Sequence, residues 1–278
     1  MFAILEKRAL ARDTVCHFRI EAPLIAQKAK AGQFVVVRPT ETGERIPLTI
    51  VRSDPAEGTI DLVFQKVGKS TALLGTFNKG DAILDIIGPL GRPTAIEKLG
   101  TIISVGGGTG IAALYPITRA FREIGNYVIS IIGARTKELL LMEAELRQVS
   151  DELLVTTDDG SYARRGFVTD ALQYLLAEKK DVKLVIAIGP VPMMKFVCQT
   201  TEPNRIKTLV SLNAIMVDAT GMCGACRVTV KDKMQFCCMD GPEFDGHQVD
   251  FDELMKRQAT YLKEERLAYE LFRKEQDR

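Results

Sequence analysis

The chain has 278 residues, of which 46% are hydrophobic, and a formal net charge of +1. A chain of this length can form two domains with their own cores, and its near-neutral charge gives no support for binding nucleic acids or membrane surfaces. Glu6 interrupts the apolar start, and no apolar run approaches the roughly 18 residues of a membrane span, so we predict a cytoplasmic protein.

Residues 1–95 alternate short β-rich runs with turn-forming residues. This spacing predicts an antiparallel β-barrel. The clearest strands are Gln33–Arg38, Pro47–Val51 and Thr59–Phe64, and a short helix is expected at Ser70–Leu74.

Residues 96–210 change to an alternation of strands and helices, which predicts a doubly wound parallel α/β sheet. The expected strands are Thr101–Val105, Tyr127–Ile132, Leu153–Thr157, Leu184–Ile188 and Ile206–Val210.

The first strand of this second region runs into a glycine-rich turn. Its residues are Gly106, Gly107, Gly108, Thr109 and Gly110. Glycines at such a position let the backbone approach a pyrophosphate at the amino end of the next helix. The run does not satisfy the G-x-G-x-x-G pattern, so an ordinary strand-to-helix turn is the alternative.

Charged residues follow the second and third strands. Arg135 and Lys137 suit the 2′-phosphate of NADP(H), whereas Glu138 suits the 2′-hydroxyl of NAD(H). Asp158 and Asp159 are candidates for contact with the nucleotide, although an Asp-Asp-Gly sequence is equally a turn signal.

Residues 211–278 contain four of the six cysteines and end in an amphipathic stretch, Phe251 to about Lys274, that predicts one helix. Asp218-x4-Cys223-x2-Cys226, followed by Cys237-Cys238, has the C-x4-C-x2-C…C spacing of a plant-type [2Fe–2S] loop, with aspartate at the first position. A zinc half-site or a redox dithiol are alternatives. We predict Asp218, Cys223, Cys226 and Cys238 as ligands. Two alternatives are that Asp218 only caps the loop and that Cys237 is a ligand.

The order of these motifs resembles the ferredoxin–NADP⁺ reductase superfamily. Arg45, Pro47, Leu48 and Thr49 stand where the superfamily has its flavin motif, without its tyrosine, and Gly68, Lys69, Ser70 and Thr71 resemble the FAD pyrophosphate loop. Gly189, Pro190 and Met193 resemble the later nucleotide motif, and the residues after Cys238 resemble the electron-transfer subunits of dihydroorotate dehydrogenase B.

Within the superfamily, the chain is most similar to the small-subunit family of NADH-dependent reduced ferredoxin:NADP⁺ oxidoreductases, because Asp218 replaces the first of four cysteines. The resemblance implies FAD, a [2Fe–2S] cluster and NAD(H) as cofactors. It also implies electron bifurcation with a larger, NADP(H)-binding FAD/[4Fe–4S] partner subunit and with ferredoxin. Two other functions remain open: a dihydroorotate dehydrogenase B electron-transfer subunit without bifurcation, and a zinc-stabilised binding module.

Overall fold

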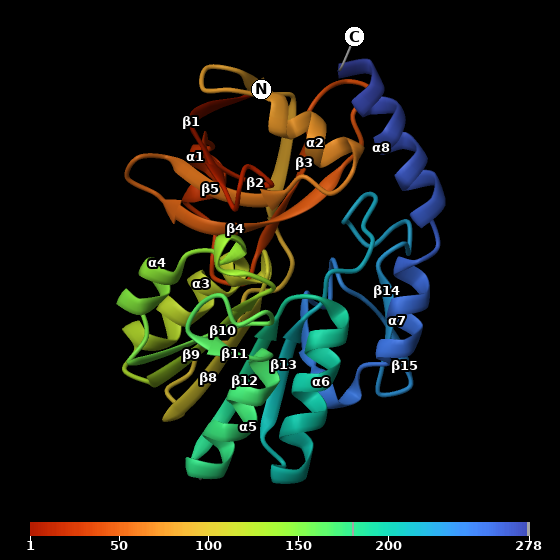
Figure 1. The fold of residues 1–278 in the computed structure, drawn as a ribbon. Helices are drawn as coiled ribbons and strands as arrows, with labels where there is room; N and C mark the ends of the chain where they lie inside the picture. Colours follow the sequence, from red (N-terminus) through yellow and green to blue (C-terminus); the bar gives the residue numbers. More distant parts are fainter. Residues whose placement is uncertain (180, 277–278) are drawn as a thin grey trace.

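The computed structural model describes residues 1–179 and 181–276 and is shown in Figure 1. Two seven-stranded sheets lie one above the other in this view, and the two C-terminal helices run along one side of both. In the described ranges, no helix is both long and apolar enough to cross a membrane.

The first sheet is antiparallel and curled, with strand order β6-β1-β2-β5-β4-β3-β7. Its apolar side chains face inward around Phe18, Leu62 and Leu74, and every pairing between neighbours is antiparallel. The predicted barrel architecture is therefore confirmed. Its elements are β1 (Phe2–Leu10), β2 (Val15–Glu21), α1 (Pro23–Ala26), β3 (Phe34–Arg38), β4 (Ile46–Asp54), β5 (Thr59–Gln65), α2 (Lys69–Thr76), β6 (Ala82–Ile83) and β7 (Asp85–Leu90).

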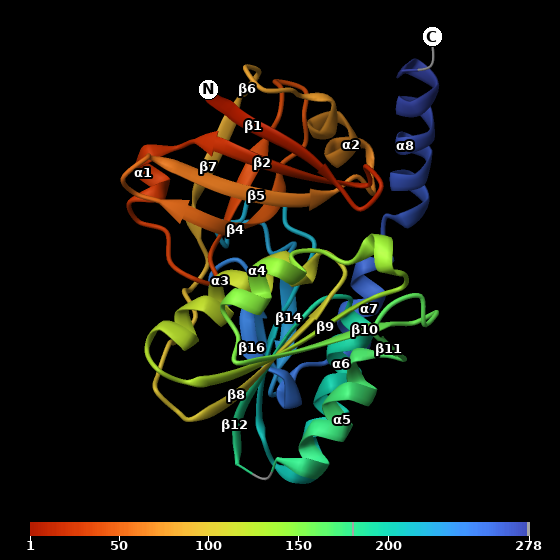
Figure 2. The ribbon, with the colours of Figure 1, turned by 60° about the vertical axis from the view of Figure 1, so that its left-hand side comes forward.

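The second sheet has the order β11-β10-β9-β8-β12-β13-β16, and its first six strands are parallel. Helices lie on both of its faces (Figure 2), which confirms the doubly wound prediction. Its elements are β8 (Thr101–Gly107), α3 (Gly110–Glu123), β9 (Tyr127–Ala134), η1 (Lys137–Leu139), α4 (Glu143–Gln148), β10 (Glu152–Thr157), β11 (Arg164–Arg165), α5 (Val168–Glu178), β12 (Val182–Ile188), α6 (Val191–Thr201), η2 (Glu202–Asn204) and β13 (Lys207–Ser211).

The third region is not separate from the second sheet. Its strand β16 pairs antiparallel with β13, from Leu209↔Asp245 to Ser211↔Glu243. The hairpin of β14 and β15 carries the cysteine loop at its base. The elements of this region are β14 (Arg227–Val230), β15 (Lys233–Phe236), β16 (Glu243–Asp245), η3 (Gly246–Gln248), α7 (Phe251–Gln258) and α8 (Leu262–Gln276).

The prediction of one continuous C-terminal helix is wrong. Helix α7 ends at Gln258, and α8 begins at Leu262. Between them, the N–H groups of Ala259 and Thr260 donate hydrogen bonds to the carbonyls of Met255 and Arg257. The break lets the two helices pack against different parts of the molecule. Helix α7 contacts α6 and β14, whereas α8 rises along the barrel and contacts α2 (Figure 1).

Candidate functional site

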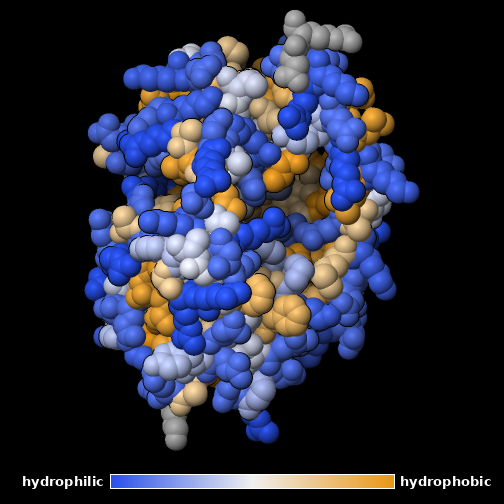
Figure 3. All heavy atoms as spheres, viewed as in Figure 1, coloured by the Kyte–Doolittle hydropathy of each residue, from blue (hydrophilic) through white to orange (hydrophobic). Residues whose placement is uncertain are grey.

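A cavity of about 690 Å³ lies where the barrel, the second sheet and the third region meet. Cavities of this size are typical of small-molecule and cofactor sites. Figure 3 shows that hydrophobic side chains line a hollow between the barrel and α8 on one face of the molecule. Three regions line the cavity: the barrel with Pro47, Leu48, Thr49 and Thr71, the sheet with Gly107, Gly108, Thr109, Gly110, Gly189 and Pro190, and the third region with Asn213, Ala214, Met216, Pro242 and Gln258.

Helix α2 of the barrel has open space at its amino end. Helix α2 begins after Gly68, where an added Cβ would meet no atom within 4 Å. The hydroxyl of Thr71 accepts hydrogen bonds from the N–H groups of Val67 and Gly68, at 3.1 and 3.2 Å. The first N–H groups of a helix lack acceptors within the helix and attract anions. This turn therefore fits the pyrophosphate of a dinucleotide such as FAD.

Neighbouring barrel residues have different surroundings. The hydroxyl of Ser70 donates to the carboxylate of Glu44, which ties the β3–β4 connection to α2. Arg45 and Lys69 are exposed. Their long cationic side chains lie outside the lining of the cavity, so roles in flavin binding stay predictions for both.

The glycine-rich turn after β8 lies tightly against the end of β12. A Cβ on Gly110 would lie 2.3 Å from the carbonyl oxygen of Ile188, and one on Gly107 would lie 2.4 Å from Sδ of Met193. Gly108 has a φ of +55° and open space at its Cβ position. The packing at Gly110 brings α3 close to β12, and the open space at Gly108 leaves room for a nucleotide pyrophosphate at the amino end of α3.

The charged residues after β9 are held by specific contacts. The carboxylate of Glu138 accepts a hydrogen bond from the hydroxyl of Thr136 at 2.7 Å and pairs with Arg12 of the barrel at 3.2 Å. The ammonium of Lys137 lies 4.9 Å from the ring centre of Tyr162. Arg135 is exposed. At this strand end the carboxylate of Glu138 is held by a hydrogen bond and an ion pair, while the ammonium of Lys137 faces the Tyr162 ring.

Asp158 and Asp159 begin the turn after β10, and their N–H groups bond to the carbonyls of Ala134 and Arg135. Burial raises the pKa of the Asp158 carboxyl, and nearby Arg135 opposes this shift. The Asp159 carboxylate accepts the N–H of Ser161 at 2.9 Å, which is a turn-stabilising role. The turn therefore packs beside η1, next to the proposed nucleotide position.

The cysteine loop brings two of the four predicted cluster ligands into contact. Sγ of Cys226 lies 3.2 Å from Sγ of Cys238, which is too long for a disulfide and close enough for a shared metal ion. Both are buried, whereas Cys223 is exposed. Cys237 is fully buried in the core and contacts the loop through its backbone N–H, which bonds to the carbonyl of Cys226.

Asp218 closes the other half of the loop. Its two carboxylate oxygens accept the N–H groups of Thr220 at 2.9 Å and Cys223 at 3.0 Å, and these bonds lower the pKa of the carboxyl. Across residues 1–179 and 181–276, no three His, Cys, Asp or Glu side chains converge on one metal position. A [2Fe–2S] cluster needs two pairs of ligands instead, because each iron takes two. Cys226 with Cys238, and Asp218 with Cys223, are the predicted pairs, of which the structure brings the sulfurs of the first into contact.

Each carboxylate oxygen of Asp218 has a second lone pair, so Asp218 can accept the loop N–H groups and still bind iron. We expect Asp218→Asn to keep only one of the two loop hydrogen bonds, because an amide has a single acceptor oxygen. It should also change the EPR spectrum and potential of the reduced cluster, because an amide is not an anionic ligand. Asp218→Cys should retain a cluster with a different spectrum. EPR and potentiometric titration measure both effects.

The matched control is Asp240→Asn. Asp240 also accepts a backbone N–H, that of Phe236 at the end of β15, and pairs with Arg92, but is not a predicted ligand. If the EPR spectrum of Asp218→Asn is identical to that of the wild type, Asp218 is not a ligand and only accepts the loop N–H groups.

The structure gathers about half of the predicted cofactor residues in one cavity. Outside its lining lie Arg45, Gly68, Lys69, Ser70, Gly106, Arg135, Asp158, Asp159 and Met193. Sequence reasoning missed Phe34 and the segment 213–216, which also line it. The position of 213–216 directly after the last parallel strand was an available signal, because ligands bind beyond the carboxyl ends of such strands.

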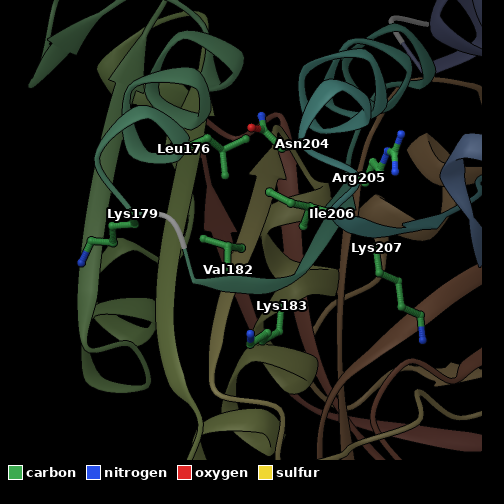
Figure 4. Close-up of a pocket in the computed structure, with 8 residues that line it drawn as sticks. All are labelled: Leu176, Lys179, Val182, Lys183, Asn204, Arg205, Ile206 and Lys207. Atoms are coloured by element: carbon green, nitrogen blue, oxygen red, sulfur yellow. The ribbon is translucent and has the colours of Figure 1, made fainter.

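A second cavity, of about 510 Å³, lies at the amino ends of β12 and β13, away from these motifs. Figure 4 shows that the side chains of Lys179, Arg205 and Lys207 point away from one another around it. These cations do not converge on a common ligand position. Open parallel sheets bind ligands at the other, carboxyl end of their strands.

Two protein-family models match the chain. The oxidoreductase NAD-binding domain matches residues 105–199, and the iron–sulfur cluster binding domain of dihydroorotate dehydrogenase B matches residues 213–250. The first contains the glycine-rich turn, and the second contains all four predicted cluster ligands.

Several proteins are similar over nearly the whole length. A Thermotoga maritima protein, a homolog of the dihydroorotate dehydrogenase B (NAD(+)) electron transfer subunit, is 49% identical over 271 residues, 98% of this chain and 95% of that protein. The electron transfer subunit of dihydroorotate dehydrogenase B from Fusobacterium nucleatum is 31% identical, covering 89% of this chain and 96% of that subunit.

The fold is likewise similar to solved structures. A chain from a structure of the NADH-dependent reduced ferredoxin-NADP oxidoreductase, studied for flavin-based electron bifurcation, has a TM-score of 0.93 and 48% identity over 98% of both chains. The cytochrome b5 reductase domain of Ulva prolifera nitrate reductase has a TM-score of 0.60 at 20% identity, covering 73% of this chain and 92% of that one. The latter likeness concerns the fold alone.

Proposed function

Because the chain belongs to the family of dihydroorotate dehydrogenase B electron-transfer subunits, we propose that it is the small subunit of an electron-bifurcating oxidoreductase. In this function it exchanges hydride with NAD(H) and couples NAD(H) to ferredoxin and NADP(H) through a larger subunit. The 48% identity and TM-score of 0.93 to a chain of the bifurcating enzyme support this choice.

The chain is an NAD(H)-dependent flavin and iron–sulfur oxidoreductase subunit that uses FAD, a [2Fe–2S] cluster and NAD(H). Bound FAD exchanges hydride with NAD(H) as well as single electrons, and the cluster carries single electrons. The protein's own contribution is to bind these groups, to orient them and to exclude water.

The single observation that carries the proposal is the cavity shared by all three regions. Barrel residues Leu48 and Thr49, the glycine-rich turn and the segment 213–216 line the same space. The segment 213–216 leads directly into the cysteine loop, which begins at Asp218. A hydride donor, a flavin and a one-electron carrier can therefore be held next to one another, which the proposed reaction requires.

The contacts after β9 favour NAD(H). A carboxylate at the end of this strand accepts a hydrogen bond from the ribose 2′-hydroxyl and repels a 2′-phosphate. Glu138 is held there through both of its oxygens. We therefore assign the 2′-hydroxyl to Glu138.

Exposed apolar residues around the cysteine loop support a partner subunit. Val217, Met222 and Met239 are 54%, 87% and 50% exposed and lie close in sequence to the predicted ligands. Large apolar side chains grouped at a surface often mark an interface. We infer that a larger FAD/[4Fe–4S] subunit, which binds NADP(H), docks over this loop and connects the chain to ferredoxin.

The second candidate function is electron transfer in a dihydroorotate dehydrogenase B complex without bifurcation. The match of residues 213–250 to the iron–sulfur domain of that enzyme favours it. Asp218 favours the bifurcating function instead, because it replaces the first cysteine of the loop spacing.

The test uses the complex purified with its native partner. We expect NADP⁺ reduction to require both NADH and reduced ferredoxin: one NADH and two reduced ferredoxins supply four electrons, which reduce two NADP⁺. The isolated chain should show reduction of its flavin by NADH but no coupled reaction. NADP⁺ reduction with either donor alone would contradict bifurcation, and dihydroorotate-dependent reduction of NAD⁺ would establish the alternative.

A further inference from the structure

The turn between β1 and β2 has an unusual backbone. Ala11, Arg12 and Asp13 have φ values of 48°, 55° and 62°, so three successive residues other than glycine adopt the left-handed conformation. That conformation costs free energy for any residue with a Cβ. Strain of this kind persists only where surrounding contacts impose it.

The contacts that impose it come both from the barrel and from the second sheet domain. Leu10, Ala11 and Val15 pack in one cluster with Ile111 and Tyr115 of α3. The carboxylate of Asp13 pairs with Lys66 at 3.0 Å, and the backbone N–H of Lys66 bonds to the carbonyl of Thr14. The turn is therefore fixed against the sheet domain, and its middle residue is Arg12.

Arg12 reaches the strand end that we assign to the nucleotide ribose. Its Nη2 lies 3.2 Å from Oε1 of Glu138, while Oε2 of Glu138 accepts the hydroxyl of Thr136. Strand β9 lies next to β8, with Gly133 opposite Gly107, so this strand end adjoins the glycine-rich turn. The side chains of Arg12 and Glu138 are 72% and 43% exposed, and pairs this exposed contribute little to stability. Stability alone does not explain why a strained turn presents Arg12 here.

We propose that Arg12, supplied by the flavin-binding barrel, is a positioning residue for nucleotide specificity, acting through Glu138. The inference rests on the proposed NAD(H) site. Arg12 and Thr136 together hold the carboxylate in place for the ribose hydroxyls. In return, the carboxylate of Glu138 pairs with the guanidinium of Arg12, which a 2′-phosphate would otherwise bind.

This pairing makes the preference for NAD(H) depend on two domains. Without Glu138, the repulsion of a 2′-phosphate is lost and Arg12 is free to bind it through charge-assisted hydrogen bonds. Without Arg12, Glu138 keeps its charge but loses one of its two anchors. The effects of the two residues are therefore not additive.

The experiment measures binding of ADP-ribose and 2′-phospho-ADP-ribose to the FAD- and cluster-loaded protein by calorimetry, which needs no turnover. The wild type should bind ADP-ribose at least about tenfold more tightly, the difference that one charged contact makes. Glu138→Gln should strengthen binding of 2′-phospho-ADP-ribose about tenfold, and adding Arg12→Asn should remove that gain. Arg12→Asn alone should weaken ADP-ribose binding by a factor of about three.

Asparagine tolerates the left-handed conformation, so Arg12→Asn preserves the turn. The matched control is Arg8→Gln, which removes an exposed arginine that pairs with Glu6 on the same strand; it should change neither affinity. The inference is overturned if Arg12→Asn has no effect in either background while the wild type still prefers ADP-ribose. A wild type that binds neither ligand would instead overturn the proposed nucleotide site, and the inference with it.

Discussion

Alanine in place of Cys226 or of Cys238 should remove the [2Fe–2S] cluster, whereas alanine in place of Cys237 should leave it bound. The sulfurs of Cys226 and Cys238 are 3.2 Å apart, and the N–H of Cys238 also points to Sγ of Cys226, at 3.4 Å. Loss of either thiolate leaves one iron with a single protein ligand, which cannot hold the cluster. Iron and sulfide content, with the visible spectrum, measures the outcome.

Cys237→Ala is the informative comparison, because it changes the adjacent position and is equally buried. It removes one small apolar group from the core, so we expect a modest loss of stability. Cys198→Ala, far from the loop, controls for loss of any buried cysteine. FAD content should stay unchanged in all variants that fold. A cluster lost in Cys237→Ala, or retained in Cys238→Ala, would reverse the assignment of the fourth ligand.

Local patterns were enough to predict most of the architecture. The apolar run at Tyr127–Ile132 became β9, and the spacing from Asp218 to Cys226 identified the loop that the iron–sulfur family model matches. Both signals depend on residues close in sequence. Strand periodicity and loop spacing are properties that a short segment carries by itself.

Contacts between distant segments could not be predicted in this way. Strand β16 has three residues, and only its pairing with β13 makes it part of the second sheet. The amphipathic sequence pattern of residues 251–274 continues through the break at Ala259, so it gives no sign that the helix ends there. The break arises because the two halves pack against different parts of the molecule. Arg12 and Glu138 meet only because the barrel turn packs on α3.

Glu243 provides a second large effect, on stability rather than on cofactor content. It follows the cysteine loop and begins β16, where it pairs with Ser211, and its carboxylate accepts the hydroxyl of Thr94 at 2.6 Å. Thr94 belongs to the connection between the barrel and the second sheet, and its N–H bonds to the carbonyl of Ala31. The carboxyl therefore lies at the junction of all three regions.

Burial raises the pKa of Glu243 from 4.5 to about 7, although the hydrogen bond from Thr94 opposes the shift. The folded protein consequently holds this proton more tightly than the unfolded chain does. Between about pH 4.5 and pH 7 the folded state binds more protons, so the free energy of unfolding falls as pH rises. Below this window the ionisation of Glu243 does not change the free energy of unfolding. Above it the decrease in the free energy of unfolding is complete and amounts to about 3 kcal/mol.

Glu243→Gln should remove this loss, because the amide keeps the shape and cannot ionise. We expect the variant to melt several degrees above the wild type at pH 8 and at nearly the same temperature at pH 5. Melting of the cofactor-loaded protein at both pH values measures the difference, and Glu57→Gln, at an exposed loop position, should show none. A Glu243→Gln variant that is less stable at pH 8 would mean that the ionised carboxylate stabilises the junction. In that case Thr94 would be acting as the donor to a charged group, and the pKa of Glu243 would lie below its usual value.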